Sequence, residues 1–350
     1  MQVDIKQSQH LVFGAGLIGC YLGGVLSYLG LNTRLVCRPV IKNKLQQGIK
    51  LTDYLEHVSS NIALQFAEQL ESGPPVSETS PIDFLWLTVK CTGIEQAVRD
   101  IAPFVSANTV ILCCQNGLGS EALLKTHFAN NQVLRVMVPF NVVELKPGHY
   151  HRGSQGSLTL EYSPSTQASI EALAKVLQCD FLPVALSQNM SALLWAKLQL
   201  NLGNSINALA DIPVKAMLQQ RGYRLVIARL MRELLAVTDA LSISLPKVTS
   251  LPAHWLPRVL SLPDFLFARV ANSMLAVDPN VRTSMWWDVS QGKETEIDFL
   301  NGAIVEQAEL LGLQTPANKK IIELIKALHQ KSAPHKIRSI NANDLLTMLG

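Results

Sequence analysis

Residues 10–19 read HLVFGAGLIG, and the fold can be inferred outward from this stretch. The apolar run His10–Phe13 predicts a strand that ends at Gly14. The next segment, Ile18–Leu29, has few polar positions and predicts a helix buried against a sheet. The glycines fit the spacing G-x-G-x-x-G, in which the first permits a tight turn, the second lets backbone approach a pyrophosphate, and the third allows close helix packing.

A glycine-rich turn by itself can also occur in a protein that binds no ligand there. Here it lies between a strand and a helix, and the helix N-terminus can donate N–H groups to phosphates, so we predict a dinucleotide site. Its expected cofactor-binding residues are Gly14, Ala15, Gly16, Leu17, Ile18 and Gly19.

Apolar runs alternate with helical patterns through the first half of the chain. The expected strands after the first are Leu35–Cys37, Phe84–Val89, Thr109–Cys114, Val133–Val143 and Leu158–Tyr162, with a helix over Ile94–Ile101. This alternation predicts an α/β fold with a parallel, doubly wound sheet of Rossmann type. Residues 72–81, SGPPVSETSP, have the composition of a surface loop, and residues 149–157 predict a hairpin or loop.

Helical periodicity dominates the second half, over residues 189–210, 220–242 and 295–312 and again after Pro316. A chain of 350 residues with 48% hydrophobic residues is long for one domain. We therefore predict a Rossmann-type domain over residues 1–187 and an all-α domain over residues 188–350.

The charge balance gives no reason to expect a polyanionic partner. Lys and Arg total 30 against 27 Asp and Glu, a formal charge of +3, so we expect a small-molecule partner and neither nucleic acid nor a membrane. The six cysteines have no metal-ligand spacing and predict buried thiols in a reducing cytosol, with no metal site. They are Cys20, Cys37, Cys91, Cys113, Cys114 and Cys179.

An uncharged stretch at residues 11–33 raises the alternative of a membrane helix, and Gly19 and Gly23 in it have G-x-x-x-G spacing. Against this stand its six glycines and the lack of a second comparable stretch. It also lacks a signal-peptide cleavage pattern. A soluble, cytoplasmic protein is expected.

Basic residues stand where an NAD-binding fold usually has an acid on the ribose, about 20 residues beyond the glycines. No acidic residue occurs between Asp4 and Asp53. Arg38 directly follows a predicted strand and can form a forked contact with a 2′-phosphate, which favours NADP over NAD. For the neighbouring basic residues Arg34, Lys42 and Lys44, an ordinary solvent-exposed face is the favoured explanation.

Two further polar positions follow predicted strands. Lys90 ends the strand Phe84–Val89, and Asn116 follows the strand Thr109–Cys114. Ligands bind at the carboxyl ends of strands in open sheets, so both are candidates, although an exposed lysine and an Asn-Gly turn explain them equally well.

In the helical half, Lys197, Asn201 and Asn204 are spaced i, i+4 and i+7 along one helix face. Asparagine is a poor helix former, which favours a polar pocket wall over an amphipathic surface helix. Further on, Glu296 begins a predicted helix on its apolar side and is either a partner of the helix dipole or a site residue.

The chain resembles the ketopantoate reductase (2-dehydropantoate 2-reductase) family over nearly its whole length. The resemblance lies in GAGLIG, VKCTG, QNGLG, WAKLQLN, TSMWWD and GKETEIDFLNG, in the family's order. It implies a Rossmann-type domain followed by a helical domain like that of 6-phosphogluconate dehydrogenase, in a monomer or homodimer.

The resemblance also implies NADPH-dependent reduction of a 2-keto acid, forming pantoate for pantothenate and coenzyme A synthesis. Lys197 would be the general acid, Glu296 would position it, and Arg38, Lys90 and Asn116 would bind the cofactor. The implied substrate-binding residues are Asn201, Asn204, Ser205, Ser284 and Asp288.

The chain departs from the family pattern at two substrate-side positions. Ser205 and Val281 stand where asparagines are frequent, and extra material occurs near residues 53–80 and 246–266. One alternative is therefore an NADP-dependent reductase of a different 2-keto or 2-hydroxy acid. A more distant one is a non-catalytic NADP-binding sensor, which would need neither Lys197 nor Glu296.

Overall fold

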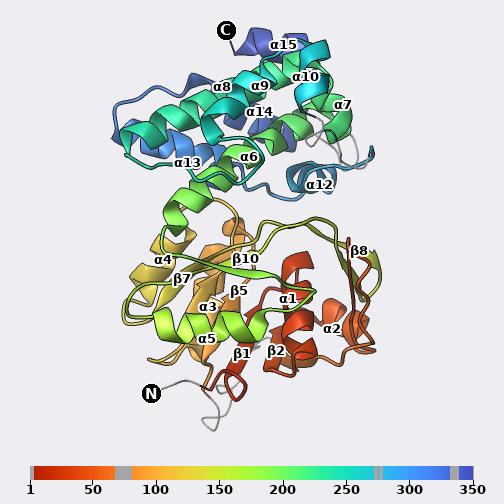
Figure 1. Ribbon diagram of the computed structural model, residues 1–350, viewed down its shortest axis with the longest axis vertical. Coiled ribbons are helices and arrows are strands. Elements are labelled where there is room, and N and C mark those ends of the chain that lie inside the picture. The colour runs from red at the N-terminus through yellow and green to blue at the C-terminus, as the bar shows by residue number, and fades with distance from the viewer. Residues whose placement is uncertain (1–3, 68–80, 272–274, 276–278, 332–338, 350) are drawn as a thin grey trace. The chain divides into compact units, whose positions relative to one another are not determined.

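The computed structural model describes residues 4–67, 81–271, 275, 279–331 and 339–349. The chain divides into two compact units, Met1–Met190 and Ser191–Gly350 (Figure 1). The sequence predicts the start of the helical second domain near Ser187.

The first unit is built on an eight-stranded sheet with the order β4-β2-β1-β5-β6-β7-β10-β11. Its strands are β1 Gln9–Phe13, β2 Asn32–Val36, β4 Gln65–Ala67, β5 Phe84–Leu87, β6 Val110–Cys113, β7 Val133–Met137, β10 Leu158–Glu161 and β11 Val184–Ser187. Val12 of β1 lies opposite Leu35 and Trp86. Neighbouring strands are parallel except β7 and β10, which run antiparallel. The predicted doubly wound sheet is confirmed, with one antiparallel pair added.

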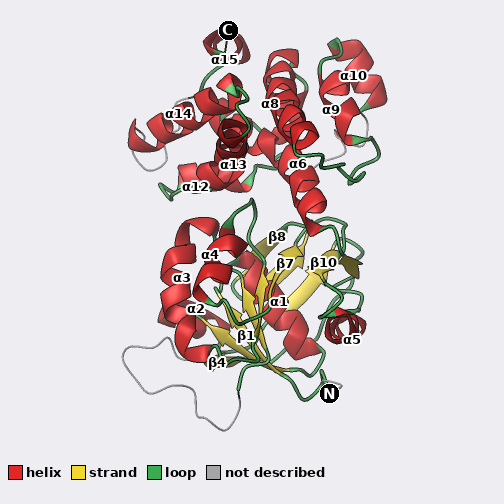
Figure 2. Cartoon of the chain, turned by 90° about the vertical axis from the view of Figure 1, so that its left-hand side faces the viewer, coloured by secondary structure: helices red, strands yellow, loops and turns green. Residues whose placement is uncertain are grey.

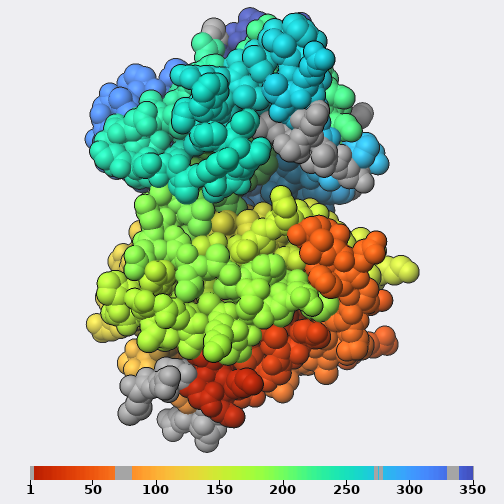
Figure 3. Space-filling model, in the orientation of Figure 1, coloured from red at the N-terminus to blue at the C-terminus, as the bar shows by residue number. Residues whose placement is uncertain are grey.

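Helices cover both faces of this sheet, as Figure 2 shows. They are α1 Leu17–Tyr28, α3 Ile94–Ile101, α4 Ser120–His127 and α5 Gln167–Leu177. One apolar core joins α1 and α5 to the face that carries Val12, and a second core joins α3 and α4 to the face that carries Leu11 and Phe13. In the space-filling view, the yellow-green segment with α5 covers the front of this unit (Figure 3). Burial on both faces explains why the central strands are almost entirely apolar.

The single strand predicted over Val133–Val143 was wrong, because two strands occupy this region. Pro139 follows β7 and cannot donate to a sheet, and β8 Val142–Lys146 begins after it. A three-stranded sheet then forms with the order β3-β9-β8, where β3 is Lys50–Asp53 and β9 is His149–Arg152. Residues 149–157 were predicted as a hairpin or loop. Residues 149–152 form β9, the second strand of an antiparallel hairpin with β8, and only residues 153–157 form a loop. The loop predicted at residues 72–81 lies, apart from Pro81, outside the described residues.

The described residues of the second unit form helices and no strand. They are α6 Met190–Ala210, α7 Val214–Leu218, α8 Arg221–Ala240, α9 Leu256–Leu260, α10 Asp264–Val270, α12 Ser284–Ser290, α13 Ile297–Leu310, α14 Pro316–Lys331 and α15 Ala342–Met348. The first unit also contains the short helix α2 Pro39–Leu45. Helix α8 packs against α7, α9, α13, α14 and α15 and is the centre of this unit. In the part of the chain that is described, no helix is both long and apolar enough to cross a membrane.

All six cysteines lie in described segments and are free thiols. Five are buried, as predicted, but Cys179 is half-buried. It lies just beyond α5 in the short turn that leads to Leu182, partly buried against the edge of the apolar core.

Candidate functional site

The glycine turn between β1 and α1 needs each of its glycines for a different reason. Gly14 has φ +111°, and a Cβ on it would lie 2.7 Å from the backbone nitrogen of Val89. A Cβ on Gly19 would lie 1.9 Å from the carbonyl oxygen of Gly14, so α1 can pack against the turn only without a side chain there. A Cβ on Gly16 would meet no protein atom within 4 Å, so its surroundings are open for a ligand to approach the backbone.

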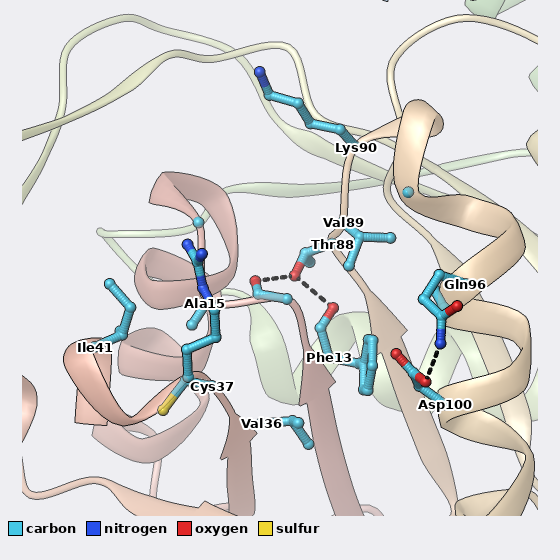
Figure 4. Close-up of a pocket in the computed structure, with 15 residues that line it drawn as sticks. Phe13, Ala15, Val36, Cys37, Ile41, Thr88, Val89, Lys90, Gln96 and Asp100 are labelled. Atoms are coloured by element: carbon cyan, nitrogen blue, oxygen red, sulfur yellow. Dashed lines mark hydrogen bonds between the residues drawn. The ribbon is translucent and has the colours of Figure 1, made fainter. Parts of the chain in front are cut away.

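A cavity of about 600 Å³ opens beside this turn (Figure 4). Figure 4 shows Cys37 and Ile41 on one side, Gln96 and Asp100 on the other, and Val36 near its base. Of the predicted turn residues, Gly14, Ala15 and Gly16 line it, whereas Leu17, Ile18 and Gly19 begin α1. Neither the N-cap Gly16 nor the first turn of α1 carries an acidic residue, so the helix N-terminus is suited to a phosphate.

Arg38 lines the same cavity. Strand β2 ends at Val36, so Arg38 does not follow the strand directly as predicted but occupies the N-cap position of α2, where Pro39 begins the helix. Lys44, in the last turn of α2, pairs with Glu144 at 2.5 Å. Arg38 is thus the member of the basic cluster placed at the cavity together with the glycine turn.

Lys90 also lines the cavity, whereas Asn116 is not among its lining residues and lies three residues beyond the end of β6 at Cys113. Strand β5 ends at Leu87, earlier than predicted, and the hydroxyl of the next residue, Thr88, donates to the carbonyl oxygens of Phe13 and Gly14. The Gln115 side-chain amide donates to the carbonyl oxygens of Leu87 and Val89. This amide ties the ends of β5 and β6 together, which keeps Asn116 close to the segment that carries Lys90.

Among the lining residues that sequence reasoning missed, Thr88, Gln96 and Asp100 carry hydroxyl, amide and carboxylate groups. Thr88 was part of a predicted strand. The signal for the other two was available, since Gln96 and Asp100 are polar at i, i+4 spacing on the predicted helix Ile94–Ile101.

In the second unit, the predicted polar face of α6 is half-buried. Lys197, Asn201 and Asn204 all have intermediate exposure, and buried residues such as Leu198 and Leu202 lie between them. A fully solvated stripe would be more exposed than this. The arrangement fits a pocket wall better than a surface helix.

Asn207, one turn beyond Asn204, has a structural role. Its side chain is fully buried, donates to the carbonyl oxygen of Ile212 at 2.7 Å, and accepts from the backbone nitrogen of Thr283 at 3.1 Å. The Thr283 hydroxyl also lies 3.3 Å from the carbonyl oxygen of Asn204. The segment that begins α12 is therefore fixed against α6 beside the predicted polar face.

The predicted substrate-binding residues on this segment and on α6 differ in their access to solvent. Ser284, the first residue of α12, is exposed, and Asp288 is buried. Ser205 is fully buried and its hydroxyl donates to the carbonyl oxygen of Leu202 within the helix. The structure thus brings Ser284 next to the polar face of α6 and does not present Ser205 there.

Glu296 immediately precedes α13, which begins at Ile297 and not at residue 295 as predicted. The residue is only 8% exposed. Although it occupies the N-cap position, its side chain makes no capping hydrogen bond within the described residues, and its backbone carbonyl accepts from Phe299 and Leu300. Capping by the carboxylate therefore does not explain why an acid is buried here.

Comparisons with known proteins agree with this architecture. The model of the ketopantoate reductase PanE/ApbA family matches residues 10–165, and the model of its C-terminal domain matches residues 189–329. A 2-dehydropantoate 2-reductase of Streptococcus pyogenes is 24% identical over 326 residues, covering 90% of this chain and 96% of the relative. One of Aquifex aeolicus is 24% identical over 249 residues, covering 70% of this chain and 76% of the relative.

Solved structures are similar as well. The PanE/ApbA family ketopantoate reductase from Ralstonia eutropha has a TM-score of 0.75 and 26% identity, covering 93% of this chain and 99% of its own. D-mandelate dehydrogenase with NADH and anilino(oxo)acetate has a TM-score of 0.72 and 21% identity over 92% of this chain and 99% of its own, which shows a shared fold. With both family models matched in order along most of its length, the chain belongs to the ketopantoate reductase PanE/ApbA family of oxidoreductases.

Proposed function

We propose that this chain reduces a 2-keto acid with NADPH, and that the substrate is 2-dehydropantoate, giving pantoate for pantothenate and coenzyme A synthesis. The observation that carries the proposal is the cavity beside the glycine turn, where Arg38 stands in place of the usual ribose-binding acid. The curated relatives named 2-dehydropantoate 2-reductase support the choice of substrate.

The residues around the cavity fit a phosphorylated dinucleotide. The open side of Gly16 and the N-terminus of α1 would hold the pyrophosphate, and Arg38 would bind the 2′-phosphate. Lys90 would add a second positive charge, and Asn116 would lie toward the nicotinamide end. The preference for NADPH remains part of the proposal, because one similar structure, D-mandelate dehydrogenase, holds NADH.

The bound nicotinamide would supply a hydride to the keto carbon. Lys197 would donate a hydrogen bond to the keto oxygen and then a proton as negative charge develops there. Asn201, Asn204 and Ser284 would hold the polar groups of the substrate. The buried acids Glu296 and Asp288 would orient the lysine and the substrate-binding segment.

The decisive test is NADPH oxidation by the purified protein with a panel of 2-keto acids that includes 2-dehydropantoate. Lys197→Ala should lower kcat by about 100-fold or more, as expected for loss of a general acid. Lys293→Ala, which removes an exposed lysine of the same unit, is the matched control and should leave kcat unchanged. Absence of turnover with every keto acid would refute the enzymatic proposal, and unchanged turnover in Lys197→Ala would refute the role of that lysine.

A second candidate is a reductase of the same build that prefers another 2-keto acid. It is favoured by Val281, which places an apolar side chain three residues before Ser284 where the family often has asparagine. Ranking kcat/KM over the panel separates the two, since a substrate better than 2-dehydropantoate by tenfold or more would favour the second. Binding of NADPH without turnover of any acid would point to a sensor. We further propose a cytoplasmic monomer or homodimer, which gel filtration can resolve.

A further inference from the structure

We propose that Asp100 recognises the 6-amino group of the cofactor's adenine ring, and that Gln96 holds the Asp100 carboxylate in position for this contact. The inference rests on the proposed function, because it assumes that the cavity beside the glycine turn holds the adenosine half of NADPH. It assigns specificity for the base to a pair of residues on α3.

The Gln96–Asp100 pair is held in one orientation by a directed series of hydrogen bonds. Arg99 donates to Gln96 Oε1 from Nε at 3.2 Å and from Nη2 at 2.6 Å. Gln96 Nε2 in turn donates to Asp100 Oδ1 at 2.7 Å. Because the guanidinium has only donors, the oxygen of the Gln96 amide must face it, and the NH₂ group must face Asp100.

This arrangement leaves an acceptor at the wall of the cavity. Among the described residues, Asp100 Oδ2 accepts no hydrogen bond and Asp100 forms no ion pair. Figure 4 shows one carboxylate oxygen of Asp100 bonded to Gln96 and the other turned toward Phe13. A carboxylate can only accept, so a ligand group that replaces water at Asp100 Oδ2 must be a hydrogen-bond donor.

The rest of this end of the cavity suits a flat aromatic base. The lining across the cavity from Asp100 is mostly apolar, with Val36, Cys37 and Ile41 from the β2–α2 region, and Ala97 lies on the α3 side. A purine lying in this space would be desolvated on its faces and would need a partner at its polar edge. Adenine offers an exocyclic amine at position 6, whereas hypoxanthine presents a carbonyl oxygen that a carboxylate repels.

A purely structural role is the competing explanation. Gln and Asp at i, i+4 can stabilise a helix by themselves, and Gln96 is exposed. Such a pair would strengthen α3 equally whatever base is bound. Discrimination between two cofactors that differ only at position 6 therefore separates the two roles.

The experiment compares NADPH with deamino-NADPH, in which hypoxanthine replaces adenine, by the fluorescence of the reduced nicotinamide that both share. The wild-type protein should bind NADPH about 10- to 100-fold more tightly, the range expected for a hydrogen bond to a charged group. Asp100→Asn, which can donate to a carbonyl oxygen, should reduce this ratio to about one or reverse it. Glu95→Gln, an exposed change on α3 outside the cavity lining, should keep the wild-type ratio.

Equal affinity of the wild-type protein for the two cofactors would overturn the inference without any variant. Equal weakening of both by Asp100→Asn would also overturn it and leave the structural role. If neither NADPH nor NADH bound at all, the proposed function itself would fail, and this outcome is distinct from binding without base discrimination.

Discussion

Thr88 and Gly14 are joined by a short hydrogen bond, in which the threonine hydroxyl lies 2.6 Å from the glycine carbonyl oxygen. The same hydroxyl is 3.0 Å from the carbonyl oxygen of Phe13. The end of β5 is thereby fixed to the last residue of β1 and the first of the turn. Gly19 packs onto this junction, since a Cβ there would lie 2.5 Å from the Thr88 hydroxyl and closer still to the Gly14 carbonyl.

This junction predicts different effects for two alanine substitutions on α1. Gly19→Ala should weaken NADPH binding by about tenfold or more and lower Tm, because relieving the clash requires the turn to move. Gly23→Ala is the control, since its Cβ would lie at an ordinary 3.6 Å from Leu35, and better helix propensity should add up to about 1 kcal/mol of stability. Cofactor titration and chemical denaturation measure both. Similar behaviour of the two variants would contradict this account of the turn.

We expect substitution of Arg38 to cause a selective loss of affinity for NADPH. Arg38→Asp replaces a guanidinium at the cavity with a carboxylate, which repels a 2′-phosphate and accepts hydrogen bonds from a ribose hydroxyl. The KM for NADPH should rise by about 100-fold, while the KM for NADH should change by less than about threefold. Lys175→Asp, the same charge reversal at an exposed position near the end of α5, should change neither. An equal rise for both cofactors would show that Arg38 does not read the 2′-phosphate.

Much of the fold was predictable because its signals are local. The strand His10–Phe13, the glycine turn and the helix α1 are adjacent in the sequence, so apolar periodicity and turn chemistry were sufficient. The helix Ile94–Ile101 was predicted with its observed ends. The small sheet was not predicted, because β3 pairs with β9 across almost a hundred residues and both strands are short.

For the candidate site, residue type alone could not separate functional from structural polar groups. Asn204 and Asn207 look alike in the sequence, yet one is half-buried on the polar face of α6 and the other is fully buried and hydrogen-bonded to Ile212 and Thr283. Ser205 likewise satisfies its hydroxyl inside the helix. Ile212 and Thr283, the partners of Asn207, lie on segments whose position relative to α6 the sequence does not specify.

The two asparagines therefore predict opposite phenotypes. Asn207→Ala should lower the free energy of unfolding by about 2–4 kcal/mol, because it removes a fully buried side chain and its two hydrogen bonds to the half-buried backbone groups of Ile212 and Thr283. Asn204→Ala should change it by less than about 1 kcal/mol, since the Asn204 side chain makes no hydrogen bond within the described residues. If Asn204 binds substrate, its variant should instead raise KM for the keto acid. Denaturation and steady-state kinetics test both, and a large stability loss in Asn204→Ala would contradict the assignment.

A buried ion pair in the first unit links stability to pH. Asp53 and Arg152 are fully buried and 2.9 Å apart, and His57 Nδ1 lies 2.9 Å from the same Asp53 oxygen. Burial raises the pKa of Asp53, but hydrogen bonds from His57 and Arg152 outweigh it and hold the pKa below its ordinary value. The hydrogen bond to Asp53 raises the pKa of the partly exposed His57.

The direction of each shift fixes the pH range over which it stabilises the fold. The contribution of His57 is complete below its ordinary pKa of 6.5 and is lost as the pH rises through the higher pKa of the folded state. The contribution of Asp53 is complete above its ordinary pKa of 3.8 and is lost as the pH falls through the lower folded value. Both contributions are therefore complete between these two ordinary values.

This pH window makes the contribution of His57 to stability depend on pH. The loss of Tm in His57→Ala should be larger at about pH 5.5 than at about pH 9, because the charge-assisted bond to Asp53 weakens as the raised pKa of His57 is passed. Val58→Ala, an exposed substitution next to His57 that removes no titratable group, should show no such difference between the two pH values. Thermal denaturation of the three proteins at both pH values measures the effect. A loss of Tm in His57→Ala that is independent of pH would mean that the ring contributes through its edge contact with Phe181 and not through its charge.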